Sequence, residues 1–353
     1  MPMTLVSTLL PTYDRVEFVG GAIETVLGQT HEAVEVIVVD GGSTDGTYDV
    51  LRQYADDERV SVLQDGPNDG IAHARNRALS HARGEYVCVL DDDDRWHPEK
   101  IERQLAVFEE CNETCGVVYT GGVACRNGRA VGTYRPRADR RGDIYPEILA
   151  DFGLNPYSSH MIRRSCFERV GTYDTRFPHG EDWDLSIRLA REYEFAAVSE
   201  PLVERRLHEA NRSQQFRDTT DMELVWDEYG AAIRRHPEIE ARFVTRWYRR
   251  RSRVALERGA YADAIALSLR AATRQPSTNA LALVASACLG RRGLSVVRRL
   301  RAHADRYLAT AGADAGLGAD GSDGTNANNG PAGASETEGN ASRSPPGRSE
   351  RPT

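Results

Sequence analysis

The residues best suited to chemistry in this sequence are four consecutive aspartates, Asp91–Asp94. They follow directly on the apolar run Tyr86–Leu90, which we expect to be a short buried strand, and they precede a helix that we expect to begin near Pro98. Adjacent carboxylates repel one another, and hard oxygen ligands favour Mg²⁺ or Mn²⁺. The alternative is a solvated acidic loop that stabilises the next helix through its dipole. The run alone is consistent with both interpretations.

Two further polar clusters each follow a predicted strand. Pro11–Arg15 follows the apolar run Thr4–Leu10, and Asp40–Asp45 follows Val34–Val39. The alternation of strands with helices predicts an α/β fold with a doubly wound, mostly parallel sheet, in which ligands bind beyond the carboxyl ends of the strands. Neither a G-x-G-x-x-G fingerprint nor a P-loop motif is present. The remaining elements expected here are a strand at Arg59–Leu63 and helices at Phe18–Leu27, Tyr48–Tyr54 and Ile71–His81.

The second half of the chain begins with a mixed pattern and ends in helices. His179–Trp183 opens an amphipathic helix, and a polar loop, His208–Ser213, follows the last predicted strand. Ala311–Thr353 contains almost no large apolar residue and is expected to be disordered. The strands expected in this half are Val117–Tyr119, Ala130–Tyr134, Ser158–Ile162, Phe195–Val198 and Leu202–Arg206, and the helices are Ile144–Leu149, Asp221–Arg235, Pro237–Glu257, Tyr261–Arg274, Asn279–Leu289 and Ser295–Leu308.

Charge is spread unevenly along the chain. The formal net charge is −8, yet residues 241–310 hold 15 arginines against three acidic residues, and Lys100 is the only lysine. Few lysines with surplus aspartate indicate either a high-salt organism or a GC-rich genome. The arginine-rich helices, with an apolar stripe at Leu294, Val297 and Leu300, fit either peripheral contact with an anionic membrane or a basic face packed on the acidic N-terminal part. Nucleic-acid binding is disfavoured, because aromatic residues are not interleaved with the arginines.

The length of 353 residues permits more than one structural part. We expect a compact α/β domain at 1–216, an arginine-rich helical extension at 217–310 and a disordered tail at 311–353. No apolar run approaches the ~20 residues of a membrane span, and no signal peptide is recognised. The six cysteines form no CxxC pair and show no secreted-type spacing. We therefore expect a cytoplasmic protein, or one at the cytoplasmic face of the cell membrane.

Six segments occur in a set order within residues 4–213, and their combination resembles the family 2 glycosyltransferases, inverting enzymes of the GT-A fold. One departure is Gly41, where the family usually has a second aspartate. Because Asp40 remains, nucleotide binding is still expected, although the preference for the base can differ. The matching segments are Pro11–Arg15, Val38–Asp45, Gly70–Asn76, Leu90–Pro98, Gly180–Asp182 and His208.

The resemblance implies a role for each matched residue. Asp182 would be the catalytic base that takes the proton of the acceptor hydroxyl. A bound Mg²⁺ or Mn²⁺ would stabilise charge on the departing nucleoside diphosphate. The implied nucleotide-sugar ligands are Pro11, Thr12, Tyr13, Arg15, Asp40, Ser43, Arg75, Asp91 and Asp92, the acceptor contacts are Glu181 and Trp183, and the metal ligands are Asp91, Asp93 and His208.

Ordinary structural roles remain open for several of these residues. Arg75 has the alternative of a surface helix residue, Tyr13 that of a core aromatic, and His208 that of a structural histidine. Asp94 is expected to cap the following helix.

The expected function is metal-dependent, inverting transfer of a sugar from a nucleoside diphosphate to a hydroxyl of a lipid-linked or cell-surface glycan. A catalytically silent nucleotide-sugar-binding subunit or scaffold is an alternative, but it would be expected to have lost Asp93 or Asp182. A nucleotidyltransferase would need a glycine-rich basic loop, and Pro11–Arg15 contains no glycine. The helices of residues 217–310 have the further alternative of a partner-binding module.

Overall fold

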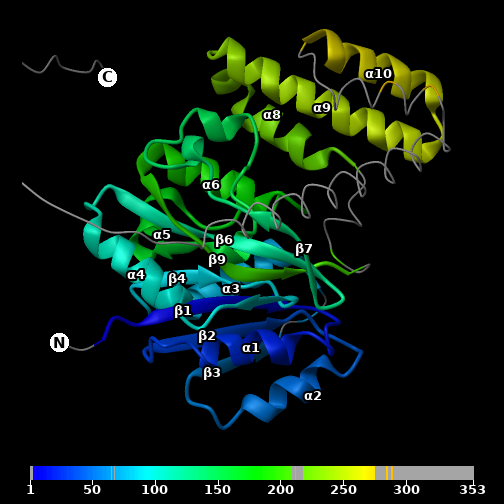
Figure 1. Ribbon diagram of the computed structural model, residues 1–353. Helices are drawn as coiled ribbons and strands as arrows, with labels where there is room; N and C mark the ends of the chain where they lie inside the picture. Colours follow the sequence, from blue (N-terminus) through cyan, green and yellow to red (C-terminus); the bar gives the residue numbers. More distant parts are fainter. Residues whose placement is uncertain are drawn as a thin grey trace, which may run out of the picture. The chain divides into compact units, whose positions relative to one another are not determined.

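The structure is a computed structural model that describes residues 3–64, 66, 68–208, 211, 218–274, 284 and 288 (Figure 1). All of these residues lie in one compact unit, Met1–Asp305. The predicted helix Ser295–Leu308, its apolar stripe and the predicted disordered tail lie outside the described residues. The predicted helix Asn279–Leu289 also lies outside them, apart from residues 284 and 288.

The first half of the sheet consists of four parallel strands, β1 (Val6–Thr12), β2 (Val34–Asp40), β3 (Val60–Gln64) and β4 (Tyr86–Val89). They lie in the order β3-β2-β1-β4. β1 and β2 are buried along their whole length, which explains their nearly continuous apolar sequences. The polar clusters predicted to bind ligands therefore meet at one edge of the sheet.

The second half of the sheet mixes strand directions. Its strands are β5 (Asp94–Trp96), β6 (Cys115–Arg126), β7 (Arg129–Tyr134), β8 (Met161–Arg163) and β9 (Glu194–Arg206). The order continues from β4 as β8-β6-β9-β5, with β7 paired to β6. β8 runs antiparallel to β4 and β6, and β5 runs antiparallel to β9, whereas β6 and β9 are parallel. The predicted mostly parallel arrangement therefore describes the first half of the sheet.

Two strand predictions differ from the structure in this half. The two strands predicted at Phe195–Val198 and Leu202–Arg206 form the single strand β9, because pairing with β6 continues across the intervening residues with shifts of register. The strand predicted at Ser158–Ile162 is shorter. Its two serines belong to the 3₁₀ turn η4 (Tyr157–Ser159), and the strand β8 follows that turn.

Helices cover both faces of the sheet because alternate strand residues point to opposite sides. Leu10 and Val38 pack in one core with the helices of residues 19–27 and 100–110. Leu9 and Ile37 pack in a second core with the helices of residues 71–81, 164–170 and 181–192. The remaining short turns are η1 (Arg52–Tyr54), η2 (Ala138–Arg140) and η3 (Glu147–Leu149). The helices are α1 (Val19–Leu27), α2 (Thr47–Leu51), α3 (Ile71–His81), α4 (Lys100–Glu110), α5 (Arg164–Val170), α6 (Glu181–Glu192), α8 (Thr220–Ile233), α9 (Pro237–Arg258) and α10 (Tyr261–Arg274).

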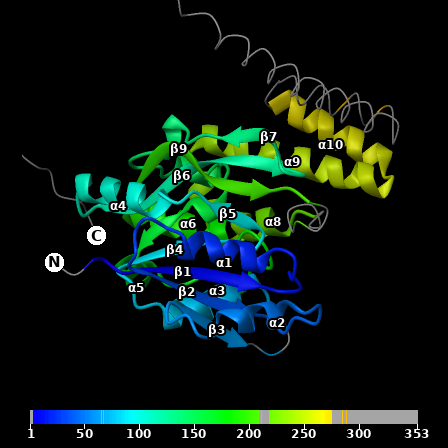
Figure 2. The same ribbon diagram turned by 60° about the horizontal axis from the view of Figure 1, so that its bottom comes forward.

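The C-terminal helices α8 and α9 share the core of the sheet. The rings of Trp183 in α6 and Phe243 in α9 are 6.0 Å apart, and the Tyr229 hydroxyl in α8 donates to the carboxylate of Asp184. Figures 1 and 2 show these helices beside the half of the sheet that contains β6 and β9. None of the described helices is long and apolar enough to span a membrane. A domain boundary at residue 216 stays a prediction.

The single lysine of the chain begins α4 and is fully buried. The Lys100 ammonium donates to Gln104 Oε1 at 2.7 Å and lies 3.9 Å from the centre of the Trp96 ring. Burial lowers the pKa of Lys100 to about 8, because the charged form loses its hydration. The folded state therefore releases this proton at a lower pH than the unfolded chain.

We expect the stability of the wild type relative to Lys100→Met to rise with pH above about 8. Between that pH and the ordinary lysine pKa, the unfolded chain holds a proton that the folded state has lost, so the difference should grow by about 1.4 kcal/mol per pH unit. Below this window the difference should be constant, whatever methionine costs by leaving Gln104 without its donor. Urea unfolding of both proteins at pH 7, 8, 9 and 9.5 checks this. Parallel stability curves would contradict it.

Candidate active site

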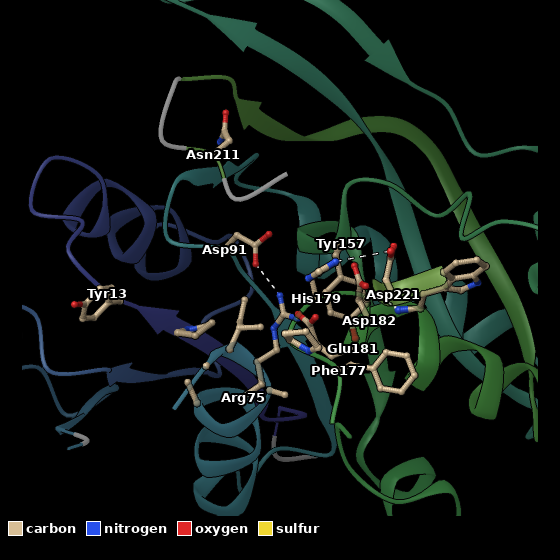
Figure 3. Close-up of a pocket in the computed structure, with 18 of the residues that line it drawn as sticks. Tyr13, Arg75, Asp91, Tyr157, Phe177, His179, Glu181, Asp182, Asn211 and Asp221 are labelled. Carbon is tan, nitrogen blue, oxygen red and sulfur yellow. Dashed lines mark hydrogen bonds and ion pairs between the residues drawn. The ribbon is translucent and has the colours of Figure 1, made fainter. Parts of the chain in front are cut away.

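A pocket with a volume of about 1340 Å³ lies at the edge of the sheet where the parallel strands end. Figure 3 shows Tyr13 on one side of it, Asp182 and Asp221 on the other, and Asp91 with Arg75 between them. We call these sides the β1 end and the α6 end. Loops after the parallel strands form the first, and α6, α8 and α9 contribute to the second. This is where open α/β sheets bind their ligands.

The β1 end contains four of the residues predicted to bind the nucleotide: Pro11, Thr12, Tyr13 and Arg15. Tyr13 is 41% exposed, so it is not a core aromatic and its ring is available for stacking on a base. A Cβ atom at Gly41 would lie 3.5 Å from the Tyr13 ring. The glycine therefore leaves space beside this ring that a side chain would fill.

Asp40 lies behind the residues of the β1 end and does not line the pocket. Its side chain is fully buried, and Oδ1 accepts hydrogen bonds from both the N–H and the hydroxyl of Ser43. Its other oxygen, Oδ2, has no hydrogen-bond partner among the described residues. A buried acceptor without a donor is costly, and the N–H of a nucleobase is the kind of donor that would satisfy it. Ser43 orients Asp40 and does not line the pocket.

Arg75 lies at the middle of the pocket and is only 2% exposed, so it is not a surface helix residue. Its guanidinium donates to Glu181 Oε1 at 2.7 Å and to Asp91 Oδ1 at 2.8 Å. The ring of Tyr157 lies 4.8 Å from its central carbon. Arg75 thus connects the acidic run after β4 to the start of α6, with both terminal nitrogens bonded to carboxylates.

The four aspartates of the acidic run have separate environments. Asp91 is bonded to Arg75, and Asp92 lies 3.5 Å from the Nε of Arg15. Burial, followed by the charge of Asp93, raises the pKa of Asp92 to about 8. An arriving cation would favour the ionised form of Asp92.

Asp94 does not cap the following helix, which corrects the sequence prediction. It begins β5 and is buried, and its carboxylate accepts a hydrogen bond from Ser158 Oγ at 2.6 Å. Burial raises the pKa of Asp94 well above its ordinary value. The N-cap position of α4 is Glu99. Asp94 is therefore a structural residue that joins the acidic run to the core of the sheet.

Two of the three predicted metal ligands are in direct contact. His208 Nε2 lies 2.9 Å from Asp93 Oδ2, and Asn211 Nδ2 donates to the same oxygen at 2.9 Å. Ligands on neighbouring corners of a magnesium octahedron are roughly 3 Å apart, given bonds of about 2.1 Å. The His208 ring is also held by stacking on Phe18, with centroids 4.4 Å apart. An ordinary hydrogen bond gives the same spacing, so metal binding by this pair stays a prediction.

The described residues contain no cluster of three or more histidine, cysteine or acidic side chains arranged to hold a metal. Asp91, the third predicted ligand, is bonded to Arg75 instead of joining Asp93 and His208. Mg²⁺ often binds through one or two protein carboxylates and takes its other ligands from substrate phosphates and water. A site built on Asp93 and His208 therefore suits a cation that arrives with a diphosphate.

Asp182 stands in the first turn of α6, at the α6 end of the pocket. Gly180 precedes this turn with φ of 86°, and a Cβ atom there would lie 2.9 Å from the Cβ of Asp221. Only glycine suits both conditions. Burial, and then the charge of Glu181, raise the pKa of Asp182 to about 7, against the opposing effect of Arg75. Asp182 is therefore poised to exchange a proton near neutral pH.

The two residues predicted to contact the acceptor are mostly buried. Glu181 is 4% exposed and is bonded to Arg75. Trp183 is 3% exposed, and its indole N–H donates to the carbonyl of Ile148 at 2.8 Å. Both line the pocket with the little surface they expose. Contact with an acceptor stays a prediction for each.

Several residues of the α6 end were given no role from the sequence: His179 lies just before α6, and the others come from segments distant along the chain. His179 Nε2 lies 3.0 Å from Asp218, and Arg250 donates to Asp221 at 2.6 Å. Arg246 of α9 lines the same end. The spacing of the α9 arginines on one helix face was visible in the sequence, but the pocket they face was not.

Several known proteins that are similar to this chain are named as glycosyltransferases. The model of the family described as Glycosyl transferase family 2 matches residues 7–171. The glycosyltransferase TuaG of Bacillus subtilis (strain 168), whose name refers to teichuronic acid biosynthesis, is 43% identical over 118 residues, which are 33% of this chain and 46% of that protein. The matched part of this chain thus spans about half of that relative. The glycosyl transferase WcaA of Escherichia coli (strain K12), named for colanic acid biosynthesis, is 28% identical over 54% of this chain and 67% of its own.

Among solved structures, the chain resembles TarS of S. aureus with a TM-score of 0.55 and 19% sequence identity. The match covers 80% of this chain and 51% of that one. A structure of TarS residues 1–349 in complex with UDP-GlcNAc gives a TM-score of 0.54 at 18% identity, over 80% of this chain and 91% of that one. At these identities the likeness establishes a shared fold.

Proposed function

We propose that this chain is a family 2 glycosyltransferase that moves a sugar from a nucleoside diphosphate to a hydroxyl group of a cell-surface glycan, with inversion and with a divalent metal. Residues 7–171 match the model of that family, and the chain has the predicted GT-A fold. The named relatives in teichuronic and colanic acid biosynthesis support the glycan class. A lipid-linked acceptor, reached from the cytoplasmic face of the membrane, is part of the same proposal.

The observation that carries this proposal is the separation of two kinds of group within one pocket. Tyr13 offers a ring for stacking at the β1 end, with the buried Asp40 behind it, whereas Asp182 stands at the α6 end. Arg75 and Asp91 lie between them. A nucleotide sugar bound along this line would place its diphosphate beside the acidic run and its sugar toward Asp182.

In the proposed reaction, the Asp182 carboxylate takes the proton of the acceptor hydroxyl as its oxygen attacks the anomeric carbon. The new oxygen–carbon bond forms as the bond from the anomeric carbon to the diphosphate breaks, so the nucleoside diphosphate leaves with the electron pair. Attack from the side opposite the leaving group inverts the anomeric centre. A pKa of about 7 makes Asp182 a base that is ionised in a large fraction of molecules near neutral pH.

Arg75 would act by holding other groups. It binds Glu181, the neighbour of Asp182, and it binds Asp91 on the opposite wall. Its positive charge also limits the rise in the pKa of Asp182. Asp93 and His208 would hold the metal ion, which when bound would stabilise negative charge on the departing diphosphate.

The test of this proposal is binding and slow hydrolysis of a panel of UDP, GDP and dTDP sugars, each with Mn²⁺, with Mg²⁺ or with EDTA. We expect one donor to bind and to be hydrolysed, and EDTA to reduce both. A silent nucleotide-sugar-binding subunit would bind a donor but not turn it over. The absence of donor binding under every condition would overturn the proposal.

A further inference from the structure

A row of arginines on α9 lines the α6 end of the pocket, where the acceptor would lie. Arg246, Arg250 and Arg253 are spaced by four and three residues, which places them on one face of the helix. The guanidinium of Arg246 lies 5.7 Å from the centre of the ring of Trp183, which is the residue after Asp182. Positive charge therefore stands beside the residue that follows the proposed base.

Of Arg246 and Arg250, Arg246 has the longer ion pair and so the less compensated charge. Arg250 is paired with Asp221 at 2.6 Å. Arg246 has its ion-pair contact with Asp151 at 4.0 Å, and that carboxylate lies closer to Arg140, at 2.9 Å. The Arg246 side chain is 47% exposed, on the pocket side of α9. It can bind an anion without first breaking a short ion pair.

Several acidic groups facing this end are paired with other residues, and Glu257 of α9 also lines it. Asp218 lies 3.0 Å from His179, and Glu181 is bonded to Arg75. Asp182 has a raised pKa, and its proposed role is to take a proton from the acceptor. An acceptor entering here would thus meet the Arg246 guanidinium, whose ion-pair contact with Asp151 is 4.0 Å long.

We infer that the acceptor carries a phosphate or carboxylate group next to the hydroxyl that receives the sugar, and that Arg246 binds this anion. The inference rests on the proposed function, because it places the acceptor at the α6 end. A guanidinium forms paired, charge-assisted hydrogen bonds with either anion. Arg246 then selects the acceptor, and at least part of the arginine excess of α9 serves the pocket itself.

The experiment compares three probes on the full chain at low salt: methyl glucoside, methyl glucuronide and glucose 6-phosphate. Titration calorimetry or ligand-observed NMR gives their dissociation constants. The wild type should bind at least one anionic probe about tenfold more tightly than the neutral one, as expected for a hydrogen-bonded charge pair. Comparing glucuronide with phosphate identifies which anion is preferred.

Three variants locate the effect. Arg246→Gln should remove the preference, and Arg246→Lys should keep part of it because the charge remains. Arg251→Gln, at an exposed position of α9 that does not line the pocket, should leave it unchanged. Equal binding of all probes by the wild type, or a preference that survives Arg246→Gln, would overturn the inference. Donor hydrolysis measured on the same samples tests the proposed function separately.

Discussion

Replacing Asp182 with asparagine is expected to lower sugar transfer by about 10²–10⁴-fold, the usual contribution of a general base. Asparagine keeps the size of the side chain. Its oxygen can still accept the hydrogen bond from the backbone N–H of Trp183, which Asp182 Oδ1 accepts at 2.8 Å. Donor binding should therefore remain, because Asp182 lies at the α6 end of the pocket. Steady-state transfer and donor affinity, measured on the same preparation, check both parts.

Two controls separate lost chemistry from lost structure. Because the pKa of Asp182 is raised to about 7 in the folded state, stability falls as the pH rises from the ordinary carboxyl pKa to about 7, and the loss is complete above that pH. Asp182→Asn should therefore be at least as stable as the wild type at pH 8. The wild-type transfer rate should rise with pH up to about 7 and then level off. An Asp182→Asn enzyme with wild-type turnover would exclude this residue as the base.

Replacing Asp93 with asparagine is expected to abolish the metal dependence of nucleotide binding and to lower transfer by at least about 100-fold, since a metal contributes several kcal/mol of charge stabilisation. The variant removes a carboxylate whose Oδ2 contacts both His208 and Asn211. Calorimetric titration of UDP and GDP, with Mn²⁺ or with EDTA, measures the effect. In the wild type Mn²⁺ should tighten binding of one nucleotide at least tenfold, and in Asp93→Asn it should not.

His208→Ala should show the same loss of metal dependence, because it removes the partner of Asp93. Asp49→Asn makes the same chemical change as Asp93→Asn at an exposed position of α2 and should leave both measurements unchanged. If Asp93→Asn binds nucleotide with full metal dependence, the cation is held elsewhere and the assignment of Asp93 is wrong.

The fold could be predicted from the sequence where contacts are local. The apolar runs of β1, β2 and β4 end in polar clusters, and their parallel pairing brings those clusters to one edge. The second half of the sheet could not be predicted in the same way. Its short strands β5 and β8 owe their existence to partners more than about 40 residues away in the chain, so no local pattern specifies them.

The site shows the same division. The motifs identified Asp182, Arg75 and the acidic run, but four identical neighbours cannot be told apart by sequence. Asp94 is buried because β5 pairs with β9, and Asp93 faces His208 for the same reason, since β9 leads directly into His208. The packing of α8 and α9 against α6 adds Asp221 and Arg246, and that packing depends on apolar contacts between distant parts of the chain.

The burial of Lys100 also determines how the protein reacts with amine-modifying reagents. Because its only lysine, the first residue of α4, has a fully buried side chain, the native protein offers no lysine amine on its surface to acylating labels or amine cross-linkers. Modification at Lys100 must await an opening that exposes this helix, so its rate measures how often the opening occurs. Modification of this one residue, followed by mass spectrometry, thus measures the rate of local unfolding in the native protein.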